Sequence, residues 1–314
     1  MLGLNYPYEK AAILLEHLAT ERTSSGAIAN ALATFADAFP DTSTDVTTSE
    51  AGNGHTWHLT TRQDEGQPPE EIVFTVQGVI LQCDLPPVVR PYGRFVSPRH
   101  VQQRVLLTGL NTATFSRALD GLARVDSLLR KAIRDNEGHV ITGNTDGFTT
   151  IDVANRYFTS KRFANDEHHI GFTTDVDPKG ILNDLRGEAF VHTADNVVEF
   201  YQRLNTNGDQ RFKKIPPSTI SEGDIVEVQI TVSLVEHSAG KGRNTNVQYF
   251  TKLVLRTLTL LDKSYSKVSQ PLIAKTNTRP ILKRKVGYTE EETKTAEQRM
   301  KRMVIDTTTG SRHS

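Results

Sequence analysis

Histidine and aspartate residues cluster in the middle of this chain. His168, His169 and His192 occur in one stretch with Asp175 and Asp177. Two histidines and one carboxylate on one face of a rigid scaffold form the iron site of many oxygenases. The His-x-Asp or His-x-Glu pair common to such sites does not occur in the sequence. A metal-dependent enzyme built on these five residues is therefore the last of our three hypotheses, and we expect no cofactor.

Motifs for phosphate binding and nucleophilic catalysis are incomplete. The stretch from Gly138 to Thr145 has the glycine spacing of a P-loop, but Asn144 replaces the lysine that attracts the phosphates. Cys83 is the single cysteine, which excludes an intrachain disulfide and a zinc site with several thiolates from this chain. The sequence thus favours a binding protein over an enzyme.

Positive charge is distributed unevenly along the chain. Lys and Arg together number 37, as do Asp and Glu, so the formal net charge is zero. Residues 263–314 carry 12 basic and 5 acidic residues, whereas the residues before them carry 25 and 32. Such a basic segment is typical of contact with a polyanion, or of docking on the acidic surface of the same chain. Both interpretations stay open.

Nucleic acid is the polyanion that we expect. Flexible backbone that carries lysine and arginine can follow phosphates, and exposed aromatic rings can stack on bases. We predict a nucleic-acid-binding protein with little sequence preference, which acts through a basic loop and the tail. The predicted phosphate contacts are Lys213, Lys214, Lys241, Arg243, Lys283, Arg284 and Lys285. The predicted stacking rings are Tyr157, Phe158, Phe163, Tyr249 and Phe250.

The tail also allows a second hypothesis. Thr289 to Glu292 form a capping box before a helix that is expected to end at Val304. This helix can dock on a partner protein or on a second copy of the chain, which would make the protein an interaction or self-assembly module. Lys283 to Lys285 also fit a short nuclear-import signal. No apolar stretch approaches the roughly 20 residues that cross a bilayer, so we expect no membrane and an intracellular protein, nuclear or cytoplasmic.

Helices are predicted where apolar residues recur at helical spacing. The stripe is clearest in residues 113–134, where Phe115, Leu119 and Leu122 begin it. Residues 41–54 are polar and without pattern, which predicts a linker or long loop. Four helices are expected before the tail, over residues 8–19, 25–39, 113–134 and 195–204.

Strands are predicted by alternation of apolar and polar residues. The alternation is strongest in residues 225–235, which we pair with residues 248–261 as an antiparallel hairpin with a basic, glycine-rich tip. Residues 56–61 and 71–85 are expected to form another hairpin, and residues 138–155 to contain short strands and turns.

The predicted fold class is α+β. N-terminal helices and a hairpin region occupy residues 1–150, a β-rich small barrel or sandwich occupies residues 151–262, and a basic tail with a short terminal helix occupies residues 263–314. A long hairpin with one apolar face needs a second layer to cover that face. An oligonucleotide-binding-like barrel would supply it.

Three segments carry a resemblance to a known family. They are Leu185–Tyr201 (LRGEAFVHTADNVVEFY), Ile215–Gln229 (IPPSTISEGDIVEVQ) and Leu253–Asp262 (LVLRTLTLLD). Over roughly residues 157–265 the chain resembles an uncharacterised protein family present in many copies in mushroom-forming fungi. The resemblance implies no particular activity. Such multiplication resembles that of passengers of mobile elements, which also points to nucleic acid.

Overall fold

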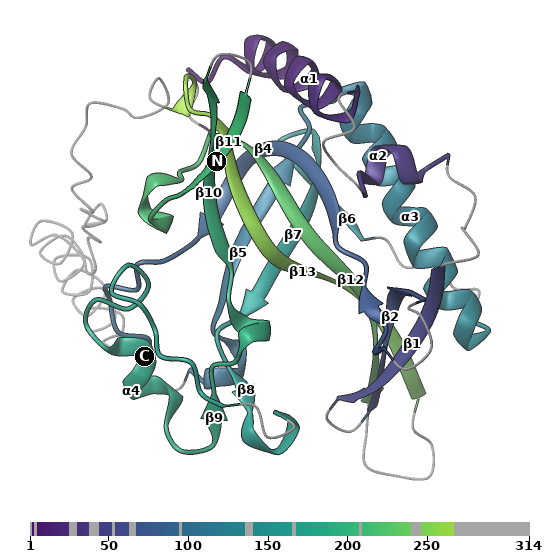
Figure 1. Ribbon diagram of the computed structural model, residues 1–314, viewed down its shortest axis with the longest axis vertical. Coiled ribbons are helices and arrows are strands. Elements are labelled where there is room, and N and C mark those ends of the chain that lie inside the picture. The colour runs from purple at the N-terminus through teal and green to yellow at the C-terminus, as the bar shows by residue number, and fades with distance from the viewer. Residues whose placement is uncertain are drawn as a thin grey trace, which may run out of the picture. The chain divides into compact units, whose positions relative to one another are not determined.

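A computed structural model describes most of the first 266 residues of the chain (Figure 1). The chain divides into two compact units, Met1–Pro271 and Leu272–Ser314. All described residues belong to the first unit, and they are residue 2 and residues 5–24, 30–37, 44–51, 54–62, 67–93, 96–135, 141–164, 168–206, 209–239 and 246–266. The predicted tail helix and the predicted contacts Lys241, Arg243, Lys283, Arg284 and Lys285 lie outside them.

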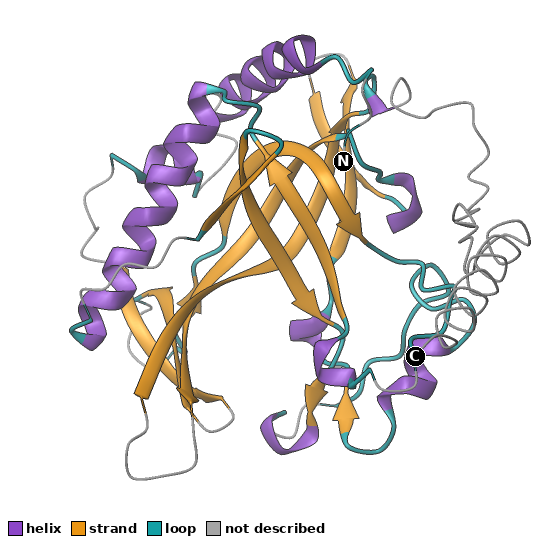
Figure 2. Ribbon diagram, turned by 180° about the vertical axis from the view of Figure 1, so that it is seen from behind, coloured by secondary structure: helices purple, strands orange, loops and turns teal. Residues whose placement is uncertain are grey.

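The described residues form α-helices, short 3-10 helices and strands (Figure 2). The α-helices are α1 (Tyr8–Ser24), α2 (Leu32–Phe35), α3 (Ala113–Ile133) and α4 (Ile181–Arg186). The strands are β1 (Thr44–Ala51), β2 (Gly54–Thr61), β3 (Glu70–Glu71), β4 (Phe74–Asp84), β5 (Gln102–Thr108), β6 (Thr142–Thr145), β7 (Phe148–Arg156), β8 (Thr159–Ser160), β9 (Phe190–Val191), β10 (Glu199–Thr206), β11 (Asp209–Lys214), β12 (Ile225–Ala239) and β13 (Asn246–Asp262).

One mixed sheet of 11 strands organises this unit, so the predicted α+β class is confirmed. Its order is β1-β2-β12-β4-β5-β7-β13-β10-β11, with β3 beside β2 and β6 beside β7. β12 also pairs with β13. Each of the five strands β12, β4, β5, β7 and β13 therefore pairs with the next, and the last pairs with the first, so that the pairings form a closed circuit. Within this circuit the β7–β13 pairing is parallel and the others are antiparallel.

Helices cover the two surfaces of the sheet at different places (Figures 1 and 2). The apolar stripe of α3 packs into the main core with the inward residues of β12, among them Val228, Val232 and Leu234. α1 packs with Val79 and Leu81 of β4 in a second, smaller core. Each helix buries its apolar side against the sheet. Where no helix covers the sheet, the alternating strands can expose polar side chains.

The two strongest sequence patterns are confirmed. α3 begins and ends within one residue of the predicted helix, and β12 pairs with β13 as an antiparallel hairpin. The apolar residues of the alternation in β12 face the core, as expected: Val226, Val228 and Ile230 are fully buried there. Both elements are specified by local patterns, which sequence periodicity reports directly.

The prediction of a linker over residues 41–54 was wrong. Residues 44–51 form β1, which pairs along its whole length with β2. β1 ends the sheet order, and over residues 44–49, whose side chains the structure describes, only Val46 packs against the main core. An edge strand with little buried surface shows no apolar alternation, and its threonine-rich composition, typical of strands, is then the remaining signal.

Two further predictions need correction. The hairpin expected between residues 56–61 and 71–85 forms only at its turn, where β3 pairs with Thr60 and Thr61 of β2. β4 does not continue it, because β12 lies between β2 and β4 in the sheet. The helix expected over residues 195–204 is a single 3-10 turn, Ala194–Asn196, followed by β10. Thr193 does cap this turn, as expected, but Val198, just before β10, and Phe200, within it, are buried in the main core. In both cases pairing with strands distant in sequence overrides the local pattern.

The boundary expected at residue 150 lies inside β7, and strands from both sides of it belong to one sheet. None of the described helices is long and apolar enough to cross a membrane.

Candidate nucleic-acid interface

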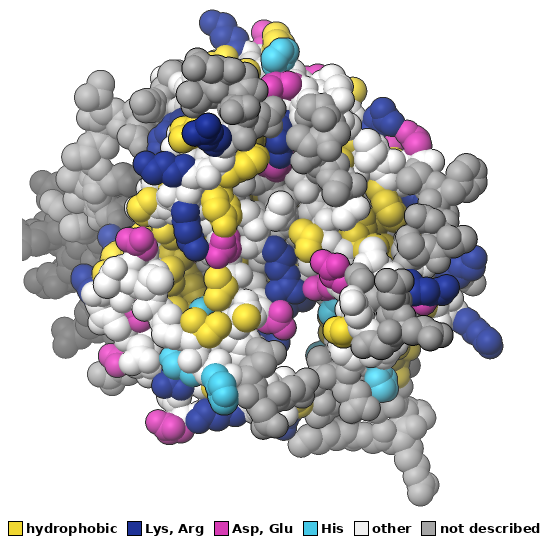
Figure 3. All heavy atoms as spheres, in the orientation of Figure 1, with side chains coloured by type: hydrophobic (Ala, Val, Ile, Leu, Met, Phe, Trp, Pro, Cys, Tyr) yellow, Lys and Arg dark blue, Asp and Glu magenta, His cyan; other side chains and the backbone are white. Residues whose placement is uncertain are grey.

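Strand register brings three cationic side chains onto one surface of the sheet. Ala154 of β7 pairs with Val254 of β13, so alternate residues on either side of these two point to the same side. Lys252, Arg256 and Arg156 are such residues, and they face away from the main core that holds their neighbours Leu253 and Leu255. Lys and Arg side chains lie near the centre of the face drawn in Figure 3, with Asp and Glu side chains beside them. We call the surface formed by Arg156, Lys252 and Arg256 the cationic face.

Two members of the cationic face have no carboxylate partner. Across the described ranges, neither Lys252 nor Arg156 makes an ion pair or a side-chain hydrogen bond. Burial of the amine, together with the charges of Arg156 and Arg256, lowers the pKa of Lys252. Burial also lowers the pKa of Arg156, against the opposing charge of Asp195. Both side chains are nevertheless exposed, so an anion can reach them from solvent.

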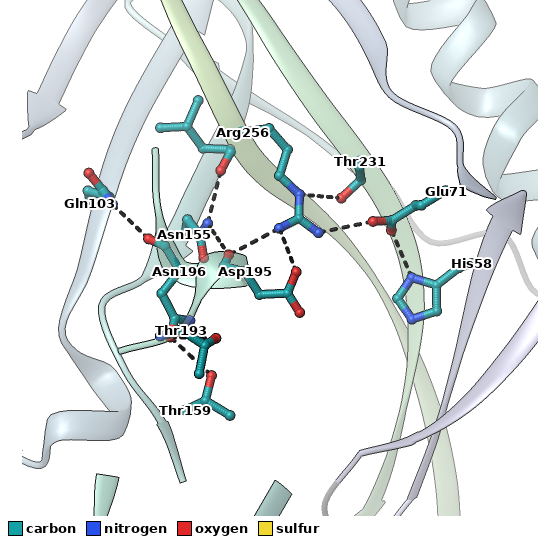
Figure 4. Close-up of polar contacts among 11 residues, drawn as sticks. His58, Glu71, Gln103, Asn155, Thr159, Thr193, Asp195, Asn196, Thr231 and Arg256 are labelled. Atoms are coloured by element: carbon teal, nitrogen blue, oxygen red, sulfur yellow. Dashed lines mark hydrogen bonds and ion pairs between the residues drawn. The ribbon is translucent and has the colours of Figure 1, made fainter. Parts of the chain in front are cut away.

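Arg256, in contrast, is held by partners from three segments (Figure 4). Its guanidinium donates to Thr231 Oγ1 at 3.2 Å, to Glu71 Oε2 at 3.0 Å and to the backbone oxygen of Asp195 at 3.0 Å. His58 in turn contacts Glu71 Oε1 through Nδ1 at 2.8 Å. Burial raises the pKa of Glu71, but the hydrogen bond from His58 and the charge of Arg256 outweigh burial and lower it. These contacts fix the position of the Arg256 side chain.

Buried amides anchor the turn that holds Asp195. Asn155 Nδ2 donates to the backbone oxygens of Asp195, at 2.8 Å, and of Leu255, at 3.1 Å. Gln103 Nε2 reaches the backbone oxygen of Asn196 at 3.3 Å (Figure 4). The turn therefore lies against the start of β5, the end of β7 and the middle of β13, and forms one border of the cationic face. Glu71 and His58 form the opposite border.

A fourth cation lies next to the cationic face but is neutralised. Arg104 of β5 pairs with Ala154, and its guanidinium makes two bonds of 2.6 Å to the carboxylate of Asp152. The hydrogen bond to Asp152 raises the pKa of Arg104. Because bidentate arginine–carboxylate pairs satisfy both charges, Arg104 adds little free positive charge to the surface.

An exposed aromatic ring continues the cationic face. Phe250 lies two residues before Lys252 in β13 and so points to the same side. Its side chain is 45% exposed and is 6.0 Å from the ring of His237. Among the other predicted stacking rings, Tyr157 and Phe158 are buried and belong to a satellite core, so the prediction was wrong for both. Phe250 is therefore the ring best placed to meet a base.

Lys213 and Lys214 lie at a different part of the sheet. Lys214 of β11 pairs with Tyr201 of the neighbouring strand β10, and Tyr201 in turn pairs with Thr259 of β13. Thr259 is seven residues beyond Lys252, or roughly 23 Å along the strand. Lys214 also makes an ion pair of 3.1 Å with Glu199. Both lysines are exposed, but the structure does not bring them to the cationic face.

The five residues of the metal hypothesis have other roles in the structure. His192 contacts the backbone oxygen of Tyr157 through Nδ1 at 2.7 Å, and its own backbone N–H donates to His169 Nδ1 at 3.2 Å. Asp177 Oδ2 accepts hydrogen bonds from two backbone N–H groups at the start of α4. His168 and Asp175 are exposed. Within the described ranges, no three His, Cys, Asp or Glu side chains are grouped so that they could hold a metal ion.

Sequence reasoning missed Arg156, Lys252 and Arg256 because each is a single cation in a strand. Runs of lysine and arginine are what marks a basic segment in a sequence, and none of these three has a basic neighbour. The signal available in the sequence was the alternation Phe250, Lys252, Val254, Arg256 along one side of a predicted strand. The position of Arg156 beside them had no such signal, since it depends on the pairing of β7 with β13.

Comparisons with known proteins identify no family. No protein-family model matches the sequence, and no curated protein matches it significantly. Among solved structures, the chain is similar to the crystal structure of gp2.5, a single-stranded DNA-binding protein encoded by bacteriophage T7. The TM-score is 0.33 and the sequence identity 14%, over 69% of this chain and 98% of that chain.

Proposed function

We propose that this protein binds single-stranded nucleic acid with little sequence preference, through the cationic face and Phe250. The observation that carries the proposal is the pair of exposed cations, Lys252 and Arg156, which share one surface and make no ion pair within the described ranges. Like charges held close together repel one another, and a bound anion relieves that repulsion. A phosphate chain is the anion that matches a row of cations with an exposed ring beside it, because the ring can stack on an unpaired base.

We also propose that the closed circuit of strands is a small barrel of the oligonucleotide-binding type. Around the circuit the strands follow one another as β4, β5, β7, β13, β12 and back to β4. Numbered by their order in the chain, they are the first, second, third, fifth and fourth strands of the circuit. Barrels of this type bind oligonucleotides on their second and third strands and on the loops after their first and fourth strands. Arg156 lies on the third strand, and residues 240–245, which include the predicted contacts Lys241 and Arg243, follow the fourth strand in sequence.

A fluorescence polarisation titration at rising salt tests the function. The probe is a labelled oligonucleotide of about 12 nucleotides, within the site sizes known for such barrels. We expect wild-type protein to bind it, with an affinity that falls as salt rises. The double variant Lys252→Ala/Arg156→Ala removes two phosphate contacts, so the slope of log affinity against log salt should decrease by about 1.4, at about 0.7 per contact.

The matched control is Lys10→Ala/Lys131→Ala, which removes the same charge from exposed positions on α1 and α3. It should leave the salt slope unchanged, because neither lysine lies on the cationic face. Wild-type protein that binds neither single-stranded nor double-stranded oligonucleotides at low salt would end the proposal. Equal loss of slope in both double variants would show that binding does not use the cationic face. The other predicted contacts, Lys213, Lys214, Lys241, Arg243, Lys283, Arg284 and Lys285, stay predictions and can be tested by the same titration.

A further inference from the structure

A pocket of about 370 Å³ opens on the outer surface of β4 and β5. Its walls combine the apolar residues Tyr92 and Val96 with polar residues, among them Asp84, His100 and Gln102, while the Cys83 side chain packs against the main core. This volume is at the lower end of the range for small-molecule sites. Such a mixture suits a flat heterocycle, which needs an apolar contact for its face and hydrogen-bonding groups for its edge.

The described lining residues of the pocket offer a phosphate little free positive charge. Arg104 contributes to the lining, but Asp152 already neutralises it. Asp84 is exposed on the rim and, in the part of the chain that the structure describes, makes no hydrogen bond or ion pair. Burial raises the pKa of Cys83 to about 12, so its thiol is uncharged near neutral pH. Among the described lining residues the free charge is therefore that of the Asp84 carboxylate, which favours a neutral group with N–H donors over an anion.

The pocket adjoins the cationic face. Gln102, which lines the pocket, pairs directly with Arg156 across β5 and β7. β13, which carries Lys252, is the next strand beyond β7. Two strand spacings amount to about 10 Å, which one or two nucleotides of an extended chain can span. A strand whose phosphates lie on Lys252 and Arg156 thus has a pocket within reach of its bases.

We propose that this pocket receives one unstacked base of the bound strand, with a preference for guanine. The inference rests on the proposed function, since it needs the phosphates of that strand on the cationic face. Tyr92 contributes an apolar wall, and the Asp84 carboxylate accepts hydrogen bonds from the edge of the base. Guanine presents two adjacent N–H donors on its Watson–Crick edge, N1–H and N2–H, which a carboxylate can accept together.

The test compares two strands of about 12 nucleotides, an ordinary oligonucleotide that contains guanine and an abasic deoxyribose-phosphate chain. Gln82→Trp fills the pocket from an exposed position on its wall, and Gln102→Ala removes one polar group. Each variant should weaken binding of the ordinary strand roughly fivefold or more. Binding of the abasic chain should stay unchanged within roughly twofold, because the cationic face is intact. Gln202→Ala on β10, remote from the pocket, is the control and should affect neither strand.

The outcomes separate this inference from the proposed function. If Gln82→Trp weakens both strands equally, or neither, the pocket does not receive a base, although the cationic face can still bind the chain. If wild-type protein binds neither strand, both proposals fail. Asp84→Asn tests the base preference, since it replaces one acceptor oxygen by a donor. It should remove the preference of the wild-type protein for guanine-containing over guanine-free strands. A guanine preference that persists in Asp84→Asn, or is absent in wild type, would overturn that part.

Discussion

At the scale of single residues, cations differ by whether a carboxylate faces them. Arg104 and Arg256 are positioned by Asp152 and Glu71, so they contribute shape and a fixed hydrogen-bond pattern more than free charge. Lys252 and Arg156 are compensated by neither. The free positive charge of this surface therefore resides in the two residues that make no ion pair within the described part of the chain.

A pH dependence of binding follows from the lowered pKa of Lys252. Burial and the charges of Arg156 and Arg256 place this pKa below the usual 10.5. As pH rises through the lowered pKa, Lys252 loses its proton before an ordinary lysine would, so affinity for a phosphate chain should fall. Lys252→Arg should remove this loss, because a guanidinium stays charged. Polarisation titrations between about pH 7 and pH 10 measure the effect, and identical pH profiles of wild type and Lys252→Arg would contradict it.

Stacking by Phe250 can be isolated with a matched pair of variants. Phe250 is 45% exposed next to the cationic face, and Phe212 is 47% exposed on β11. Phe250→Ala should weaken binding of a single strand by about 1–3 kcal/mol, the contribution of one stacked base. Phe212→Ala should leave the affinity unchanged. Both are measured by polarisation at one salt concentration, and equal losses would mean that stacking at Phe250 is not specific.

At the scale of elements, α3 is positioned by a close approach to α2. A Cβ atom added at Gly121 would lie 2.0 Å from the backbone oxygen of Leu32, so only glycine fits between the two helices. α2 contains only four residues, and its position depends on this contact with α3 and on the core residues Leu32 and Ala33.

Gly121→Ala should therefore destabilise the protein. In an exposed helix this substitution would stabilise by about 1 kcal/mol, but here overpacking is expected to cost about 1–3 kcal/mol net. Ala123→Gly calibrates the helix term, because Ala123 is exposed on the same helix and its loss should cost about 1 kcal/mol. Urea unfolding gives both values. A stabilised Gly121→Ala variant would show that α2 and α3 can separate without cost.

At the scale of the whole unit, contacts between distant segments hold the fold together. Arg22 of α1 binds Glu227 of β12 through two bonds, of 2.8 Å and 2.5 Å, across 205 residues of sequence. Both side chains are buried, and Gln77 of β4 donates a further hydrogen bond to Glu227 at 2.8 Å. This group joins the N-terminal helix to two strands of the closed circuit.

Removal of one partner of this buried pair should be severe. Glu227→Ala leaves the Arg22 guanidinium buried without its counter-charge, at an expected cost of about 3–5 kcal/mol in the free energy of unfolding. The double variant Arg22→Met/Glu227→Leu should recover most of that loss, because an apolar pair has no charge to solvate. Urea unfolding measures both variants. A double variant as unstable as Glu227→Ala would indicate that packing, and not the unpaired charge, causes the loss.

The sequence by itself determined the elements whose patterns are local. The apolar stripe of α3 and the alternation of β12 identify these elements because burial on one side repeats at the period of the helix or strand. The β12–β13 hairpin follows from the two strands being consecutive. Phe250 was also within reach of the sequence, as an aromatic residue on the outward side of a predicted strand.

Only the tertiary structure decided the rest, because strand pairing between distant segments leaves no mark on either segment alone. β1 became a strand through its pairing with β2, and β10 replaced a predicted helix beside β13. The same cause governs the candidate site. Arg156 and Lys252 are ordinary single cations in sequence, and they form one surface because β7 lies parallel to β13 with Ala154 opposite Val254.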